Sequence, residues 1–431
     1  MKIIGKTAIE ISDSVRQLVE SGELNPGNSL PPVRELAEQL GVNRNTVAAA
    51  YQKLTQADIV ISQGRAGTVI RQPAKAGEQE GLSLGTALID MADGNPNPEY
   101  LPDPRQLFGE ANVRCFLYGE ETILPDLNTY GRDWLGNDCP PGMELELTHG
   151  ALDAIERLCV AHLVQGDKVA VEDPGFMGTI GSIKLAGMRT VGIEIDDFGM
   201  KPDSLQMALN LGVRAVLITP RAHNPTGCSL NATRAQELKG ILASHPNVLV
   251  IMDDHFALVA NSPFYSIIPE TTLRWALIRS VSKGLGPDLR VAFVGCDKAT
   301  ADRLRARLAP GMNWVSHLLQ ALVLSCLTSK KIISSLKAAQ STYTENRLEL
   351  IQALRSEGIE VTSTVDGLNV WIPVSEDQKT IAYELAKKGW LVRSGNAFEV
   401  QRPSNAVRVT ISKLNPGQAG KFVKDFKFSH G

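Results

Sequence analysis

Residues 247–256, NVLVIMDDHF, place a continuous apolar run directly before two aspartates and a histidine. A run that is apolar on both faces is typical of a strand buried inside a sheet, with helices covering both of its faces. This alternation of buried strands and helices predicts an α/β domain. Further runs of the same kind, with helical stretches between them, lie at residues 168–176, 189–196, 213–220, 274–282 and 290–296.

The chain changes character on either side of this region. Residues 73–85, PAKAGEQEGLSLG, are rich in Gly, Ala, Glu and Gln, which is typical of a linker. The runs at 359–374, 379–389 and 406–412 read as strand, helix and strand, and they predict a smaller α+β part. The expected organisation is a first domain over 1–72, a linker over 73–88, and a second domain over 89–431 with a large part at about 120–320 and a small part at about 330–431.

Composition narrows the possible classes of protein. The 431 residues carry 44 Lys and Arg against 47 Asp and Glu, so any nucleic-acid binding must come from a local site rather than from overall charge. No apolar run is long enough to cross a membrane, and Glu10 and Asp13 stand where a signal peptide needs apolar residues. We expect a cytoplasmic protein without a membrane partner. Since the cysteines form no C-x-x-C pair and the histidines share no ligand spacing, we expect no metal site.

The first 72 residues predict two short helices across a tight turn. In LPPVRELAEQLGVNRNTVAAAYQKL, residues 30–54, Pro32 opens one helix, Gly41 ends it, and a second helix begins near Asn43. The segment ISQGRAGTVI, residues 61–70, then reads as a β-hairpin wing. Taken together, these motifs resemble the winged helix-turn-helix of the GntR family, which implies binding to a double-stranded DNA operator.

The resemblance places the start of the second helix in the major groove. The candidate base or phosphate contacts are Asn43, Arg44, Asn45 and Thr46, with Arg34 and the wing residue Arg65 as further phosphate or minor-groove contacts. The segment holds eight basic and seven acidic residues, so one copy should bind weakly and a homodimer is expected. The alternative is that these helices form a protein-docking module.

Four separated motifs in the second domain carry candidate chemistry. Lys283, in RSVSKGLGPDLR (279–290), leaves a buried strand for a glycine-rich turn, which suits a lysine that forms a Schiff base. Asp253 ends its strand where a carboxylate can pair with a protonated pyridine nitrogen, although Asp253 and Asp254 could equally bind a metal. Asn224, in HNPTG, can donate to a phenolate oxygen. Gly150, in THGALDAI, opens a helix whose free N–H groups can bind phosphate.

In this order the motifs resemble the fold-type I aminotransferases that depend on pyridoxal 5′-phosphate (PLP). Joined to the GntR-like segment, they make the chain similar to the MocR-type regulators. The expected fold is therefore a winged helix-turn-helix, all-α plus a wing, followed by an α/β fold-type I transferase-like domain with a smaller α+β part. The resemblance implies cofactor contacts from Lys283, Asp253, Asn224, Phe176, Gly150, Ala151, Ser280, Ser282 and Arg290, with Tyr118 reaching a partner subunit and Arg408 binding a substrate or effector carboxylate.

Each of these residues also has a plainer interpretation, and two departures from the family pattern matter. Gly150 can serve packing, Phe176 can be core, and Arg408 can be a surface or ion-paired arginine. His255 stands where MocR-type sequences commonly have tyrosine. Whether residue 255 contacts the cofactor O3′ is therefore an open question at the level of the sequence. Around residue 118 the pattern is altered, so Tyr118 and Tyr130 compete for the phosphate role.

The resemblance implies a dimeric, PLP-binding transcriptional regulator. Its nearest likeness within the family is to a regulator of vitamin B6 metabolism, with PLP as the expected effector. Two alternatives stay open: an aminotransferase with a secondary DNA-binding head, and a regulator that senses an amino acid. Because the Schiff-base lysine is present, residual transamination is compatible with the sequence.

Overall fold

The chain divides into two compact units, residues 1–77 and 78–431. The computed structural model describes residues 3–57, 59–62, 67–70, 80–81, 85–311, 314–362 and 365–429.

The first unit is a three-helix cluster with a two-stranded wing. Its elements are α1 (Ala8–Glu20), α2 (Val33–Leu40), α3 (Arg44–Gln56), β1 (Val60–Ser62) and β2 (Thr68–Ile70), and the two strands pair antiparallel. Gly41 ends α2 in the left-handed conformation, with φ of 63°. Asn43 then caps α3 by accepting a hydrogen bond from the Asn45 amide. The expected helix-turn-helix boundaries are therefore present.

The helices of this unit are held by one apolar cluster. Ile11 and Val15 of α1, Leu36 of α2, and Val47 and Leu54 of α3 are almost completely buried within it. Burial of apolar surface contributes about 25 cal/mol per Å² to the stability of this packing. The shared contacts therefore hold α2 and α3 in a fixed arrangement. The exposed start of α3 is thereby supported on a rigid base.

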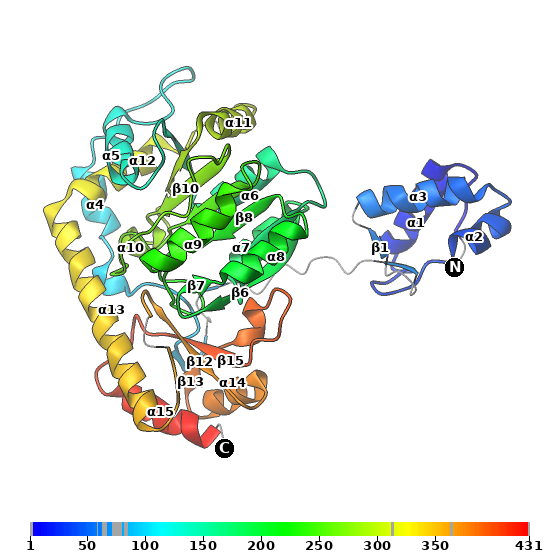
Figure 1. Cartoon of the computed structure of the whole chain (residues 1–431). Coiled ribbons are helices and arrows are strands. Elements are labelled where there is room, and N and C mark those ends of the chain that lie inside the picture. The colour runs from blue at the N-terminus through cyan, green and yellow to red at the C-terminus, as the bar shows by residue number, and fades with distance from the viewer. Residues whose placement is uncertain are drawn as a thin grey trace. The chain divides into compact units, whose positions relative to one another are not determined.

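The second unit is built on an eight-stranded sheet (Figure 1). The strands β8, β9 and β10 run parallel, and β5 and β6 continue the parallel set, whereas β11 is antiparallel to both of its neighbours. The strands, in spatial order, are β4 (Glu144–Thr148), β11 (Ala292–Cys296), β10 (Trp275–Ser280), β9 (Leu249–Asp253), β8 (Ala215–Ile218), β5 (Lys168–Asp173), β6 (Arg189–Asp196) and β7 (Gly199–Met200).

Helices cover both faces of the sheet, so its central strands are buried on both sides. In β9, Leu249 and Ile251 join the apolar cluster that includes α6, while Val250 and Met252 join the cluster of the opposite face. The covering helices are α6 (Ala151–His162), α7 (Met177–Leu185), α8 (Pro202–Asn210), α9 (Ala232–Ala243) and α11 (Lys298–Leu308), and the short α10 (Ser282–Leu285) follows β10.

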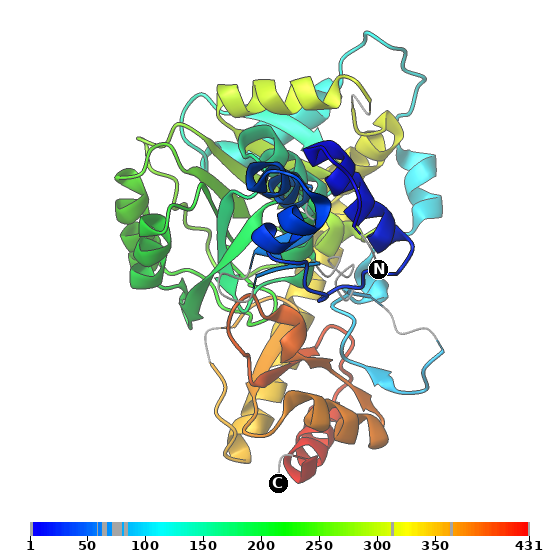
Figure 2. The same cartoon turned by 90° about the vertical axis from the view of Figure 1, so that its right-hand side faces the viewer.

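A smaller α+β part lies at one end of this unit in both views (Figure 1, Figure 2). The long helix α13 (Lys330–Ser356) runs from the sheet to this part. The segment that precedes the sheet also joins it, because β3 (Ile89–Asp90) pairs with β13. The remaining elements are the 3-10 helices at Pro98–Tyr100 and Gly395–Phe398, α4 (Pro104–Glu110), α5 (Pro125–Gly136), α12 (His317–Thr328), β12 (Asn369–Pro373), α14 (Gln378–Lys387), β13 (Trp390–Leu391), β14 (Arg393–Ser394), β15 (Ala406–Thr410) and α15 (Gln418–Ser429).

The sheet topology determines which strand ends, and therefore which functional side chains, lie close together. The carboxyl ends of β4, β5, β8, β9 and β10 meet at one edge, and the antiparallel β11 begins at that same edge. In open α/β sheets, ligands bind outside this edge. Among the described helices, none is both long and apolar enough to span a membrane.

Candidate functional site at the carboxyl edge of the sheet

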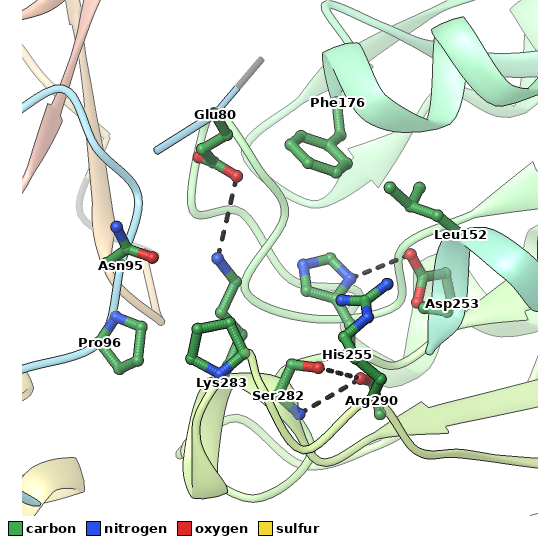
Figure 3. A pocket seen from close by; sticks show the side chains of 13 residues that line it. Glu80, Asn95, Pro96, Leu152, Phe176, Asp253, His255, Ser282, Lys283 and Arg290 are labelled. Carbon is green, nitrogen blue, oxygen red and sulfur yellow. Dashed lines mark hydrogen bonds and ion pairs between the residues drawn. The ribbon is translucent and has the colours of Figure 1, made fainter. Parts of the chain in front are cut away.

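A cavity of about 220 Å³ opens at the carboxyl edge of the sheet (Figure 3). Eight of the residues singled out from the sequence line it: Ala151, Phe176, Asp253, His255, Ser280, Ser282, Lys283 and Arg290. They end or follow four different parallel strands, or precede β11, so it is the strand order that brings them together.

Asp253 is the buried acid of this cavity. Its Oδ2 lies 3.0 Å from Nδ1 of His255. Among the described residues, its Oδ1 has no hydrogen-bond partner although it is buried. An unpaired buried carboxylate oxygen costs free energy, so it points to a ligand that supplies a donor. A protonated pyridine nitrogen is such a donor, and on this observation the site fits PLP.

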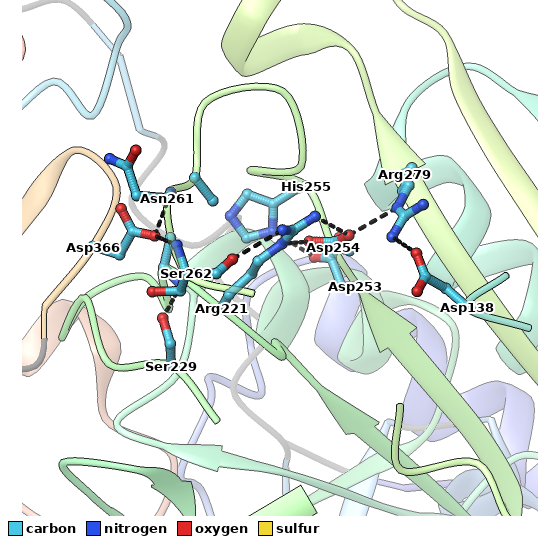
Figure 4. A network of polar contacts seen from close by, with 12 residues as sticks. Asp138, Arg221, Ser229, Asp253, Asp254, His255, Asn261, Ser262, Arg279 and Asp366 are labelled. Carbon is cyan, nitrogen blue, oxygen red and sulfur yellow. Dashed lines mark hydrogen bonds and ion pairs between the residues drawn. The ribbon is translucent and has the colours of Figure 1, made fainter. Parts of the chain in front are cut away.

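Asp254 is held in a separate network of contacts with arginines (Figure 4). Arg221 contacts both of its oxygens, at 2.7 and 2.9 Å, and Nε of Arg279 lies 2.9 Å from Oδ2. Arg279 continues to Asp138, at 2.6 Å. Because two arginines already neutralise Asp254, the two adjacent aspartates do not form a metal-binding pair, and no metal-ligand cluster occurs among the described residues.

The helix start after β4 and the strand start of β11 form an anion cradle. Gly150 has φ of 94°, and a Cβ built there would lie 2.8 Å from Nη2 of Arg290. The guanidinium therefore lies directly over the glycine, and it donates to the His149 carbonyl at 3.2 Å. Ser280 and Ser282 face each other with their hydroxyl oxygens 3.2 Å apart. Backbone N–H groups at a helix start, two hydroxyls and a guanidinium suit a phosphate.

Lys283 lies in α10, the single turn that follows β10. Its Nζ donates to the carbonyl of Gly94 at 2.6 Å and lies 3.8 Å from Oε2 of Glu80. Its side chain is 19% exposed, at the cavity wall. The amine therefore has access to the cavity while its position is set by the segment that precedes the sheet.

Arg408 in β15 is completely buried, so the interpretation as a surface arginine is wrong. Its Nη1 donates to Oδ1 of Asn224 at 3.0 Å and pairs with Glu80, and its Nη2 donates to the Ala92 carbonyl at 2.6 Å. Burial lowers the pKa of Arg408, an effect that the charge of Glu80 opposes. The small part of the unit thus contributes a guanidinium to the site of the large part.

Of the three aromatic candidates, Phe176 lines the cavity and Tyr118 and Tyr130 do not. Phe176, at the start of α7, lines the cavity with its ring 6.5 Å from that of His255. Tyr118 is 93% exposed, is not among the residues that line the edge cavity, and contacts Trp314 edge to face. Tyr130 is packed against the core beside Trp134, and burial raises the pKa of its hydroxyl.

The candidate DNA contacts lie at the exposed start of α3. Arg44 and Asn45 are exposed and Thr46 is half-buried, while Oδ1 of Asn43 is engaged in the helix cap. Arg34 is exposed on α2 and pairs with Glu38 at 3.3 Å. Arg65 lies outside the described residues.

Several cavity residues escaped the sequence interpretation: Glu80, Asn95, Pro96, Leu152 and Pro287. The dipeptides of DGNPNP, residues 93–98, signal a turn, but turn formers alone do not indicate a site. Glu80 falls within the range expected as a linker, where an acidic residue is usually solvated. Its partner Arg408 is 328 residues away, so no local pattern could reveal the contact.

The fold and the edge site together define a DNA-binding unit joined to an aminotransferase-like unit. Residues 7–70 match the gntR family of bacterial regulatory proteins, and residues 88–426 match the class I and II aminotransferases. The chain belongs to the MocR-type transcriptional regulators, and the expected order of a winged helix-turn-helix and a fold-type I domain is confirmed.

The chain is 48% identical, over 98% of both chains, to PtsJ, the vitamin B6 salvage pathway transcriptional repressor of Salmonella typhimurium. It is 27% identical, over 63% of this chain and 62% of the relative, to PdxR, the pyridoxine biosynthesis transcriptional regulator of Corynebacterium glutamicum. The structure of Pyrococcus horikoshii kynurenine aminotransferase superposes with a TM-score of 0.71 at 21% identity, covering 80% of this chain and 91% of that chain. This last likeness shows the fold alone.

Proposed function

We propose that this protein regulates transcription of vitamin B6 genes as a homodimer in the cytoplasm, and that PLP bound in the edge cavity is its effector. The observation that carries the proposal is the orphaned, buried Oδ1 of Asp253, in one cavity with Lys283 and the anion cradle. The extensive identity to PtsJ supports the choice of vitamin B6 genes.

The proposed roles come from the resemblance to the aminotransferases, and the lining of the cavity supports most of them. Lys283 attaches the cofactor, Asp253 pairs with the pyridine nitrogen, and Asn224 hydrogen-bonds O3′. Phe176 covers the ring. When bound, PLP acts as an electron sink for an attached amine. The phosphate is held by Gly150, Ala151, Ser280, Ser282 and Arg290, and Tyr118 is the candidate contribution from a second copy of the chain.

The regulatory role requires that PLP bind two states of the protein unequally. By linkage, operator DNA must then change the affinity for PLP by the same factor, ordinarily corresponding to about 1–3 kcal/mol. Arg408 favours a second candidate, an amino-acid sensor or aminotransferase, because a buried guanidinium can hold an amino-acid carboxylate.

The test begins with the DNA. Purified protein selects fragments from the genome of its source organism with and without PLP, and each selected operator is then titrated against apo and PLP-loaded protein. We expect promoters of vitamin B6 genes and a PLP-dependent shift in affinity that Lys283→Ala abolishes. Equal affinity of apo and loaded protein, with a shift only when an amino acid is added, would favour the second candidate. Borohydride reduction followed by peptide mapping identifies the lysine that carries the cofactor.

A further inference from the structure

The carboxylate of Glu80 lines the cavity and faces Lys283 there (Figure 3), and it contacts three groups assigned to ligand recognition. Its Oε1 accepts from Nδ2 of Asn224 at 3.3 Å and pairs with Nη1 of Arg408, and its Oε2 lies 3.8 Å from Nζ of Lys283. The side chain is only 13% exposed. This acid therefore belongs to the cavity, not to a solvated linker.

The charges around Glu80 match those that a bound amino acid would meet. Burial alone would raise the pKa of Glu80, but the charges of Lys283 and Arg408 and the hydrogen bonds from Arg408 and Asn224 outweigh burial and lower the pKa. Glu80 is therefore ionised at neutral pH. The other hydrogen-bond acceptors of Arg408 are neutral oxygens of Asn224 and Ala92. A buried guanidinium needs a compensating carboxylate, and Glu80 supplies it.

The backbone also leaves room for this carboxylate. A Cβ at Gly94 would overlap Oε1 of Glu80, so the glycine permits the close approach. The same residue accepts the hydrogen bond from Lys283. The cavity of about 220 Å³ is present with Glu80 in place, and its wall also includes Phe176 and Asp253. The space for the cofactor ring and the position of Glu80 thus coexist.

We propose that Glu80 is an internal carboxylate ligand of Arg408 and thereby determines which effector the site accepts. The proposal rests on the proposed function and names its ligand class. PLP carries no carboxylate, so it enters with Glu80 in place. An amino acid must displace Glu80 from Arg408 before its own carboxylate can bind. The site therefore favours the vitamer over amino acids.

Displacement of Glu80 has a consequence along the chain. Glu80 lies ten residues after Ile70, the last residue of β2 in the DNA-binding unit. A carboxylate ligand would therefore detach a point of the connecting segment that PLP leaves anchored.

The test compares L-alanine with L-alaninol, which has the same skeleton without the carboxylate. Both are titrated into three PLP-loaded proteins, and the absorption of bound PLP is followed. The proteins are wild type, Glu80→Gln and the matched control Glu99→Gln, which changes an exposed acid in the segment that precedes the sheet. We expect Glu80→Gln to tighten L-alanine binding about tenfold or more, which corresponds to about 1.4 kcal/mol, and to change L-alaninol binding little. Glu99→Gln should change neither. Equal effects on both ligands, or none on L-alanine, would overturn the proposal.

A second arm separates this proposal from the proposed function. Apo protein is heated with and without propionate, and the melting temperature of the second unit is recorded. Propionate should raise it in Glu80→Gln more than in wild type, whether or not the protein binds PLP. Glu80→Asp keeps the charge on a shorter side chain and replaces Glu80→Gln in this test if Glu80→Gln does not fold. Propionate should raise its melting temperature by an amount between those of wild type and Glu80→Gln. A wild-type response to propionate as large as that of both variants would contradict the internal-ligand role.

Discussion

Nδ1 of His255 lies 3.0 Å from Oδ2 of Asp253, two residues earlier in the chain. The imidazole itself lines the cavity, is 11% exposed, and orients the carboxylate of Asp253. A tyrosine at position 255 could not make this short contact in the same way because its hydroxyl lies farther from the backbone. His255 therefore acts on the cofactor site through Asp253, and Asn224 is left as the candidate partner of O3′.

Asp253→Asn should weaken PLP binding at least about tenfold while preserving the shape of the site. The substitution removes the charge opposite the pyridine nitrogen, and a charge-assisted hydrogen bond contributes about 1.5–3 kcal/mol. Titration of apo protein with PLP, followed by absorption, measures the change. Asp288→Asn, which neutralises an exposed acid near the same cavity, is the control and should leave the affinity intact. Equal affinities of all three proteins would remove Asp253 from the proposed role.

Gly150→Ala should weaken binding of PLP more than binding of pyridoxal, which lacks the phosphate. The new Cβ would lie 2.8 Å from Nη2 of Arg290 and would stand at φ of 94°, so the guanidinium must move away from the cradle. The backbone strain costs about 1–3 kcal/mol. Paired titrations with the two vitamers separate loss of the cradle from general damage. A parallel loss for both vitamers would show that the cradle does not hold the phosphate.

Much of the fold follows from local patterns in the sequence. The six runs appear as β5, β6, β8, β9, β10 and β11, and the central ones are mainly apolar because helices cover both of their faces. The strand β4 escaped prediction because Glu144 and Glu146 alternate with its leucines. Glu146 is nevertheless buried, since Arg305 of α11 pairs with it at 2.6 Å. That pairing depends on tertiary structure, which a local window does not contain.

Some residues of the candidate site could likewise be predicted from local patterns, and others could not. Residues that follow strands, such as Asn224 and Lys283, could be predicted to gather because parallel strands share a carboxyl edge. Glu80 could not be predicted, since it precedes the sheet and meets Arg408 only after the whole unit has folded. The antiparallel direction of β11, which brings Arg290 back to the edge, is likewise a property of the sheet rather than of its sequence run.

Arg44→Ala should weaken operator binding and leave PLP binding unchanged. Arg44 is exposed at the first position of α3, where a helix-turn-helix meets the major groove. If it contacts a phosphate, the slope of log affinity against log salt should fall by about one. Arg16→Ala, an exposed arginine on α1, is the matched control. Undiminished operator binding by residues 78–431 alone would contradict the assignment of DNA binding to the first unit.

A buried acid behind the site provides a pH-dependent readout of folding. Oε2 of Glu172 accepts from the Thr219 amide at 3.1 Å and lies 3.3 Å from Nε2 of His223. Burial raises the pKa of Glu172 from 4.5 to about 8. Burial also lowers the pKa of His223 from 6.5 to about 3. Near pH 7 both side chains are therefore mainly neutral in the folded protein.

Glu172→Gln should flatten the dependence of stability on pH between about 6.5 and 8. Through most of this window His223 is mainly neutral in both states, whereas the folded wild type keeps the Glu172 proton that the unfolded chain has lost. Because the folded state binds more protons, stability falls as pH rises, by on the order of 2 kcal/mol across about 1.5 pH units. Between about 4.5 and 6.5 the opposite shift of His223 cancels this slope. Urea unfolding of the second unit at several pH values measures the difference, and parallel slopes in wild type and variant would show that Glu172 is ionised when folded.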